Sequence, residues 1–267
     1  MITKQELISK KEYNFDDLLA VMHMLRAPDG CAWDRVQTHQ SIRKNLIEET
    51  YELVEAIDTS DFVLMREELG DVLMQVVFHC EISQENGEFH INDVINELVS
   101  KLIVRHPHVF STEVADTPEA VLDKWDSVKR QTKHQTTDTE AMLSVSRALP
   151  SLMRAHKLGS KGRKVGFDFD NAEEALGKVY EELDEVSEAI RGGNREDINE
   201  EFGDLLLSVV NAARLAGVDS EQALYEANDK FIRRFAKVEE MCLSAGKSVS
   251  DTPREEKENF WLIAKEK

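Results

Sequence analysis

The hydrophobic residues of this chain recur at the spacing of an α-helix over most of its length. The first stripe, at the i, i+3, i+4 and i+7 positions of a helix, consists of Phe15, Leu18, Leu19, Met22 and Leu25. It ends at Pro28-Asp29-Gly30, a sequence that is typical of a turn. No segment alternates convincingly between apolar and polar residues, so we expect helices and no strands.

Similar stripes predict the remaining helices. In the first half we expect helices over about 41–57, 62–84 and 92–105, and a fourth that begins at Thr117-Pro118-Glu119. In the second half we expect helices over about 172–190, 196–215 and 221–243, and a short helix after Pro253. The predicted fold class is therefore all-α.

The second set of helices repeats the order of the first set. Residues 131–140, which separate the two sets, contain no apolar side chain, as is typical of a linker. We therefore predict a first helical domain at 14–130, a polar linker at 131–143 and a second helical domain at 144–267. A chain of 267 residues is long enough for two domains that each bury a core.

An acidic pattern occurs in both halves at a separation of 133 residues. It consists of Glu48, Glu49, Glu52, Glu68 and Asp71 in the first half, and of Glu181, Glu182, Glu185, Glu201 and Asp204 in the second. Between residues 48 and 77, thirteen of thirty positions are identical one repeat later, without a gap. This agreement indicates an internal duplication, and the positions that it keeps include the carboxylates.

Helical geometry brings four carboxylates of each half together. Residues three or four apart share a helix face, so Glu49 and Glu52 project together, as do Glu68 and Asp71 on the following helix. A short turn makes these two helices antiparallel neighbours. The same arrangement recurs for Glu182, Glu185, Glu201 and Asp204. Oxygen ligands without His or Cys favour Mg²⁺, with Mn²⁺ as a substitute, so we predict a metal site in each half.

Apolar residues surround the acidic positions of the second helix in each half. They are Leu69, Val72, Leu73, Met74, Val76, Val77 and Phe78 in the first half, and 205–207 with 209–210 in the second. A helix that is apolar nearly all round is expected to be buried, and buried carboxylates need a cation beside them. The alternative is that these acidic groups form solvated helix faces, because the chain contains 52 Asp and Glu residues.

A pair of basic residues recurs on the third helix of each half. Lys101 and Arg105 are four residues apart, and so are Lys230 and Arg234. Two cations on one helix face, near a metal held by carboxylates, can bind phosphate groups. For a single pair a solvated helix face is the ordinary interpretation, and the recurrence favours a function. The basic segment 157–164 is interpreted either as part of a nucleotide site or as a solvated connector.

The formal net charge of −19 opposes binding to nucleic acid and to anionic membranes. It also opposes an anionic substrate unless cations lie between the substrate and the protein. The three cysteines, Cys31, Cys80 and Cys242, form no CxxC motif, and the N-terminal residues contain no apolar leader. We therefore expect a cytoplasmic protein.

The combined motifs resemble the MazG family of nucleoside triphosphate pyrophosphohydrolases. The family signature is a Glu-Glu-x-x-Glu helix followed by a Glu-x-x-Asp helix, and this chain contains it twice. The tandem form of the family is further matched by residues 30–34, 105–110, 149–155 and 165–168, which read GCAWD, RHPHVF, LPSLMRA and VGFD. The likeness covers about residues 15–265.

The resemblance implies a Mg²⁺-dependent homodimer that cleaves nucleoside triphosphates between the α- and β-phosphates. The products would be a nucleoside monophosphate and pyrophosphate. It assigns the metal to Glu182, Glu185, Glu201 and Asp204, the phosphates to Lys230 and Arg234, and a nucleotide contact to Trp261. The second half is usually the catalytic one in tandem members, yet every corresponding residue is present in the first half as well. Glu185 is our candidate for the group that accepts a proton from the attacking water.

Other classes of protein fit the sequence less well. A di-iron carboxylate bundle needs Glu-x-x-His motifs, and a P-loop enzyme needs GxxxxGK[ST], and neither occurs in the sequence. A non-catalytic regulator that binds nucleotides or a partner through the same carboxylates stays an alternative. Base and sugar preference do not follow from these motifs.

Overall fold

The computed structural model describes residues 2–111, 117, 121, 125, 128, 132 and 135–265. All regular elements in these residues are helices, so the predicted all-α fold class is confirmed. The chain divides into two compact units, Met1–Lys129 and Arg130–Lys267. Each unit is described by itself below. No helix in the described part of the chain is both long enough and apolar enough to span a membrane.

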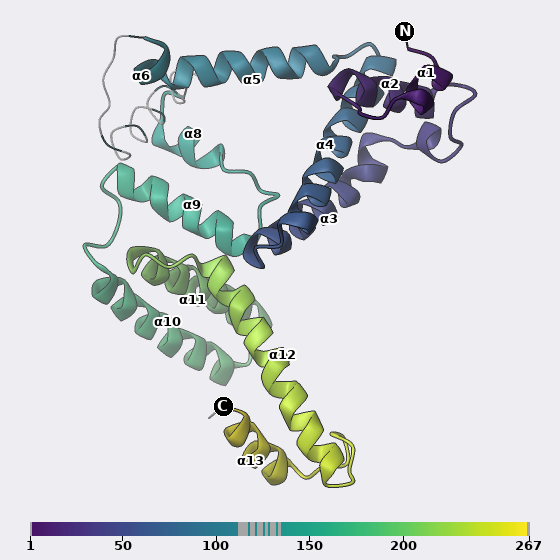
Figure 1. Cartoon of the computed structure of the whole chain (residues 1–267). Helices are drawn as coiled ribbons and strands as arrows, with labels where there is room; N and C mark the ends of the chain where they lie inside the picture. Colours follow the sequence, from purple (N-terminus) through teal and green to yellow (C-terminus); the bar gives the residue numbers. More distant parts are fainter. Residues whose placement is uncertain are drawn as a thin grey trace. The chain divides into compact units, whose positions relative to one another are not determined.

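The first unit is built around an antiparallel hairpin of two long helices (Figure 1). Its elements are α1 (Lys4–Ser9), α2 (Phe15–Arg26), the short 3-10 helix η1 (Asp34–Val36), α3 (His39–Asp58), α4 (Phe62–Glu85), α5 (Ile91–Arg105) and α6 (Pro107–Phe110). Helices α3 and α4 form the hairpin, and α2 packs against α4. The predicted bounds of the helices at 41–57, 62–84 and 92–105 agree with α3, α4 and α5 within two residues.

Local capping sets the turn of this hairpin. Helix α3 ends at Asp58, and Ser60 adopts a left-handed conformation with φ of 55°. The Asp61 side chain then accepts hydrogen bonds from the backbone N–H groups of Val63 and Leu64. These bonds satisfy two of the N–H groups that the start of α4 would otherwise leave unpaired. The short capped turn therefore fixes which residues of α3 and α4 face each other.

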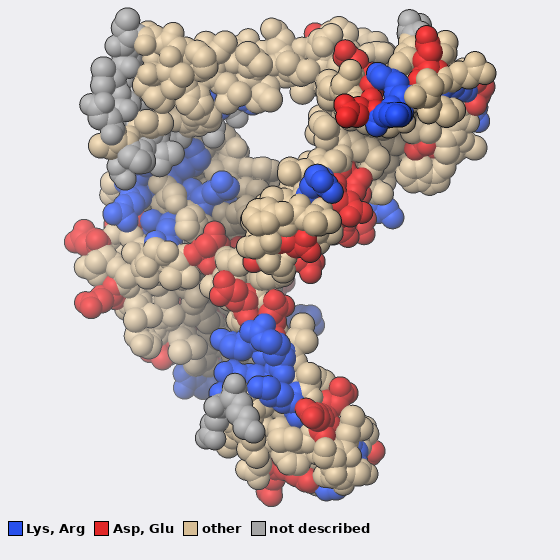
Figure 2. All heavy atoms as spheres, in the orientation of Figure 1, with Lys and Arg blue, Asp and Glu red and all other residues tan. Residues whose placement is uncertain are grey.

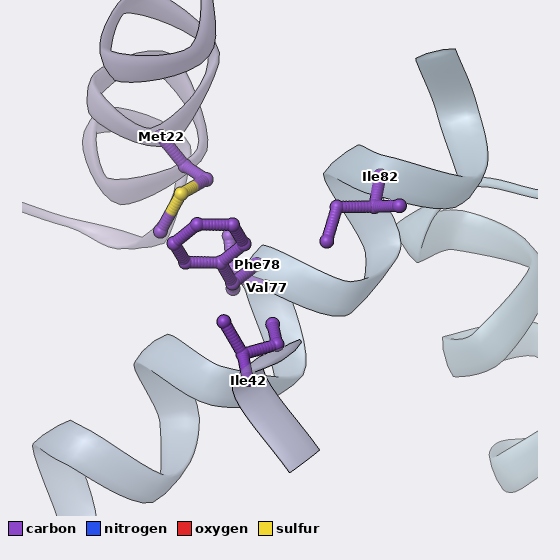
Figure 3. Close-up of a cluster of buried hydrophobic side chains, with 5 residues drawn as sticks. All are labelled: Met22, Ile42, Val77, Phe78 and Ile82. Atoms are coloured by element: carbon purple, nitrogen blue, oxygen red, sulfur yellow. The ribbon is translucent and has the colours of Figure 1, made fainter. Parts of the chain in front are cut away.

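The core of the first unit lies where α2, α3 and α4 meet. Figure 3 shows Met22 of α2, Ile42 of α3, and Val77, Phe78 and Ile82 of α4 in contact. Beside this cluster the Arg26 guanidinium lies over the Phe78 ring, 5.2 Å from its centroid, and donates hydrogen bonds of 2.8 and 2.7 Å to Glu85. Apolar packing and this ion pair together hold α2 on the C-terminal half of α4.

The second unit repeats the hairpin. Its elements are α8 (Asp138–Leu143), α9 (Ser151–Lys164), α10 (Ala172–Gly192), α11 (Arg195–Leu215), α12 (Ser220–Ser244) and α13 (Arg254–Lys265). Helices α10 and α11 form the hairpin, and Gly193 closes its turn with φ of 74°, a conformation that glycine adopts without strain. Helix α13 packs against α12 through a cluster of Val238, Cys242 and Ala264.

Helix α9 contains segment 157–164, for which the sequence allowed two interpretations. Gly159 faces α11 so closely that a side chain there would overlap Asn211 and Arg214. After α9, Asp168 accepts hydrogen bonds of 3.0 and 2.6 Å from Arg214. Segment 157–164 is therefore part of a helix that approaches α11 closely at Gly159.

Two expectations need correction or restriction. The helices around the carboxylates are not buried all round in this chain, because Leu69, Leu73 and Val76 of α4 are exposed, and so are Leu206, Leu207 and Val209 of α11. A two-helix hairpin covers only one face of each helix. Helix α8 occupies the end of the predicted linker 131–143, and the predicted helix start at Thr117-Pro118-Glu119 lies largely outside the described residues.

We expect Phe78→Ala to destabilise the first unit by about 3–5 kcal/mol, because it leaves a cavity in the α2–α3–α4 core. Phe78 is 4% exposed, whereas Phe62, at the start of α4, is 74% exposed. Phe62→Ala is therefore a matched control and should change the free energy of unfolding by about 0.5 kcal/mol or less. Urea unfolding followed by circular dichroism measures both. Equal losses in the two variants would contradict this assignment of the core.

Candidate metal centres

Each hairpin brings three carboxylates together. Ligand oxygens of Glu49, Glu68 and Asp71 all lie within 4.8 Å of one another, and we call this group the first triad. The second triad consists of Glu182, Glu201 and Asp204, whose oxygens lie within the same 4.8 Å limit. One glutamate comes from the first helix of each hairpin, and the other two residues come from the second helix, one turn apart. This separation is suitable for oxygen ligands around one divalent cation.

The most buried member of each triad has an oxygen without a partner. Glu68 is 6% exposed and Glu182 is 5% exposed. Among the described residues, Oε2 of each side chain is buried and accepts no hydrogen bond. An unpaired buried carboxylate oxygen is costly in free energy, and a cation is the partner that would offset it. The donor set and the unpaired oxygens therefore fit a hard divalent metal ion.

The electrostatics of the triads point the same way. Burial raises the pKa of Glu68, and the negative charges of Glu52 and Asp71 raise it further. Burial likewise raises the pKa of Glu201, with Glu182 and Asp204 as the next causes. Without a cation, each triad therefore resists carrying its full negative charge.

Glu49 belongs to the same pattern in the first triad. Burial raises its pKa most, and the charge of Asp71 adds to this effect. A hydrogen bond from the Gln75 side chain acts in the opposite direction. Gln75 is buried on α4, and its own Oε1 atom has no hydrogen-bond partner among the described residues. The neutral side-chain amide of Gln75 is thus the buried polar neighbour of the first triad.

The fourth predicted carboxylate of each half lies beside its triad and not within it. Glu52 contributes to the raised pKa values of Glu49 and Glu68, which places it in their vicinity. Burial raises the pKa of Glu185, and the charge of Glu182 and a hydrogen bond with it raise it further. The sequence could not separate three converging residues from four, because that distinction depends on side-chain directions.

Sequence reasoning missed one charged residue at the second triad. The Lys178 ammonium lies 2.7 Å from Oε1 of Glu182 and 2.7 Å from Oε1 of Glu181. The i, i+4 spacing of Lys178 and Glu182 on one helix is a signal that could have revealed it. One repeat earlier, the corresponding residue is Asn45, which has no charge.

The basic pair of the first half does not join the first triad in this chain. Figure 1 shows α5 leaving the C-terminal end of α4 and running away from the α3–α4 hairpin. Arg105 lies over the Trp125 ring, 5.2 Å from its centroid, and no ion pair joins Lys101 or Arg105 to the triad among the described residues. Within the single chain, the described residues therefore show no direct contact between this pair and the first triad.

The basic pair of the second half lies on a more strongly basic helix. Figure 2 shows basic side chains gathered along α12, whose sequence there includes Lys230, Arg233, Arg234 and Lys237. No ion pair of the described residues involves Lys230 or Arg234. These two cations are therefore available to an anion.

Trp261 of α13 lies against α12. Its ring centroid is 5.4 Å from that of Phe231, and both rings line a cavity of about 530 Å³ between the two helices. Apolar side chains such as Phe235 and Val238 form most of its wall. Trp261 therefore packs into the α12–α13 interface and also borders a space into which a flat ring would fit.

The fold and the triads define a tandem all-α protein with a carboxylate site in each hairpin. Residues 37–110 and 171–238 match the MazG nucleotide pyrophosphohydrolase domain. These segments contain both triads and both basic pairs. The chain belongs to the MazG family.

Relatives extend the match to nearly the whole chain. The chain is 43% identical over 251 residues to the nucleoside triphosphate pyrophosphohydrolase/pyrophosphatase MazG of Thermotoga maritima. The matched residues make up 94% of this chain and 95% of the relative. It is 41% identical over 253 residues to the nucleoside triphosphate pyrophosphohydrolase of Escherichia coli K12, covering 94% and 96%. It is also 41% identical to the uncharacterized protein YabN of Bacillus subtilis, covering 95% of this chain and 52% of YabN.

We expect Glu68→Gln to stabilise the metal-free protein at neutral and basic pH. A raised pKa in the folded state means that the Glu68 contribution to stability is complete below the ordinary glutamate pKa and is lost as pH rises through the raised value. The melting temperature in EDTA should therefore be a few degrees higher for the variant at pH 8, and the difference should shrink on acidification.

Glu67→Gln is the matched control, because Glu67 is the exposed neighbour of Glu68 on the same helix. Its melting temperature should follow that of the unmodified protein at every pH. A lower melting temperature of Glu68→Gln at pH 8 in EDTA would show that repulsion within the first triad does not destabilise the fold.

Proposed function

We propose that this chain is a Mg²⁺-dependent nucleoside triphosphate pyrophosphohydrolase that cleaves between the α- and β-phosphates and releases a nucleoside monophosphate and pyrophosphate. The observation that carries this proposal is the pair of carboxylate triads, each with one buried oxygen that has no partner. The names of the Thermotoga maritima and Escherichia coli relatives support the choice of substrate.

The metal would be held by Glu182, Glu201 and Asp204 in the second half and by Glu49, Glu68 and Asp71 in the first, with Glu185 and Glu52 beside them. When bound, Mg²⁺, or Mn²⁺ in its place, supplies positive charge that offsets the negative charge of the triphosphate. This also accounts for an anionic substrate on a chain with a net charge of −19.

Side chains of the second half would carry the other roles. Glu185 has a raised pKa and lies next to Glu182, so it is suited to accept the proton of the water that attacks phosphorus. Lys230 and Arg234 would bind phosphate oxygens, Arg234 as a fork and Lys230 as a point charge. Trp261 would contact the nucleotide from the aromatic cavity between α12 and α13.

We further propose that the protein is a cytoplasmic homodimer with domains at 14–130 and 144–267. The support for a dimer is the row of exposed apolar side chains on each carboxylate helix, which includes Leu69 and Leu73 in one hairpin and Leu206 and Leu207 in the other. A second chain would also allow Lys101 and Arg105 to approach a triad that is not their own.

Product analysis tests the reaction. The purified protein is incubated with each NTP and dNTP and Mg²⁺, and the products are separated and identified. We expect monophosphate and pyrophosphate in equal amounts. Diphosphate and orthophosphate would contradict the proposed bond, and the absence of turnover would favour the non-catalytic regulator.

Substitutions assign the working half. We expect Glu201→Ala to lower kcat by about 10²-fold to 10³-fold, because it removes a group that positions charge at the reacting phosphates. Glu68→Ala should leave most of the activity, since we assign catalysis to the second half. Glu200→Ala is the matched control, because Glu200 is the exposed neighbour of Glu201. Unchanged kcat in both Glu201→Ala and Glu68→Ala would contradict the role of the triads.

A further inference from the structure

The two triads have different neighbours at one equivalent position. In the second triad, Oε1 of Glu182 lies 2.7 Å from the Lys178 ammonium, while Oε2 of the same side chain has no partner among the described residues. In the first triad, no ion pair to Glu49 or Glu68 occurs within the described part of the chain. An internal cation therefore occupies part of one site and not of the other.

The difference arises from one position of the duplication. Lys178 precedes Glu182 by four residues on α10, and Asn45 precedes Glu49 by four residues on α3. Both side chains therefore lie one helical turn before the glutamate, on the same face. Only the lysine carries a charge that can neutralise the glutamate. Its flexible four-carbon stem also allows the ammonium to move away while the helix stays in place.

We propose that Lys178 is a built-in competitor of the metal ion, because it occupies Oε1 of Glu182 and leaves only Oε2 free to act as a metal ligand. This inference rests on the proposed function, because it assumes that the triads bind a divalent cation. Lys178 lowers the metal affinity of the second triad, and Asn45 imposes no such competition on the first.

Lys178 also explains how the second triad tolerates the absence of metal. The Glu182 side chain is 6% exposed, and Lys178 is the cation that contacts it. A half-buried ion pair of this kind lowers the free energy of the metal-free state relative to the metal-bound state. Removal of the lysine should therefore destabilise the metal-free protein and strengthen metal binding at the same time. A purely structural role for Lys178 predicts the first effect without the second.

Reciprocal substitutions test the competition by Mn²⁺ binding, followed by the electron paramagnetic resonance of free Mn²⁺. Each site is measured alone, in a background in which Glu68→Gln or Glu201→Gln disables the other triad. We expect Lys178→Asn to lower the dissociation constant of the second triad by about threefold to tenfold. Asn45→Lys should raise that of the first triad by a similar factor, because it creates the same i, i+4 contact with Glu49.

Two controls separate the contact from the charge of the whole chain. Lys178→Arg keeps a cation beside Glu182 and should keep the affinity close to that of the unmodified site. Lys4→Asn removes one positive charge far along the chain, where Lys4 pairs with Asp29 on the surface, and should leave both dissociation constants unchanged. A tightening in Lys4→Asn as large as that in Lys178→Asn would overturn the proposal.

The remaining outcomes are distinguishable. Equal or weaker Mn²⁺ binding in Lys178→Asn would overturn the competition, and would leave the proposed function intact if the unmodified chain still binds Mn²⁺ and hydrolyses nucleotides. Failure of the unmodified chain to bind Mn²⁺ at either triad would overturn the metal dependence of the proposed function, and this inference with it.

Discussion

Repulsion among three carboxylates that lie within 4.8 Å of one another is the constraint on which the rest of this structure depends. Such a group is unfavourable unless a cation joins it, so the fold must hold the side chains in place against their own charge. Rigid helices joined by short turns do this in both halves. Asp61 caps the start of α4, and Gly193 closes the turn before α11. Each turn fixes the register in which a glutamate of one helix faces the acidic pair of the next.

Ion pairs of a buried arginine provide the second means of holding the hairpins. In the first unit Arg26 binds Glu85 at the end of α4, and in the second unit Arg214 of α11 binds Asp168 after α9. Arg26 lies on α2, the helix before the first hairpin, whereas Arg214 lies on α11, within the second hairpin. The two contacts lie at different positions of the repeat, because Glu85 corresponds to Val218 and Arg214 corresponds to Glu81. Both contacts hold the preceding segment against the second carboxylate helix.

Much of this arrangement follows from the sequence. The period of apolar residues predicted the bounds of α3, α4, α5, α10 and α11 within two residues, because amphipathic helices leave a direct pattern. The duplicated carboxylates predicted a cluster of four in each half, and the structure brings three of each four together. The separation of Glu52 and Glu185 from their triads did not follow, because it depends on side-chain directions in the packed hairpin. Helix α9 was not predicted either, and its contact with α11 at Gly159 depends on packing that the sequence alone does not show.

Three features of the single chain concern the hairpins that carry the triads. Each triad gathers negative charge, apolar side chains such as Leu69 and Leu206 are exposed on the helices that carry the triads, and Lys101 lies on a helix that runs away from its hairpin. A helix that has an apolar face and a charged site side by side is suited to a surface that closes over both. Coverage of the apolar face would also remove water from the carboxylates, and the resulting low dielectric would strengthen their attraction for a cation. In the proposed homodimer, association of chains and metal binding should therefore favour each other, because both would act on the same two helices of each hairpin.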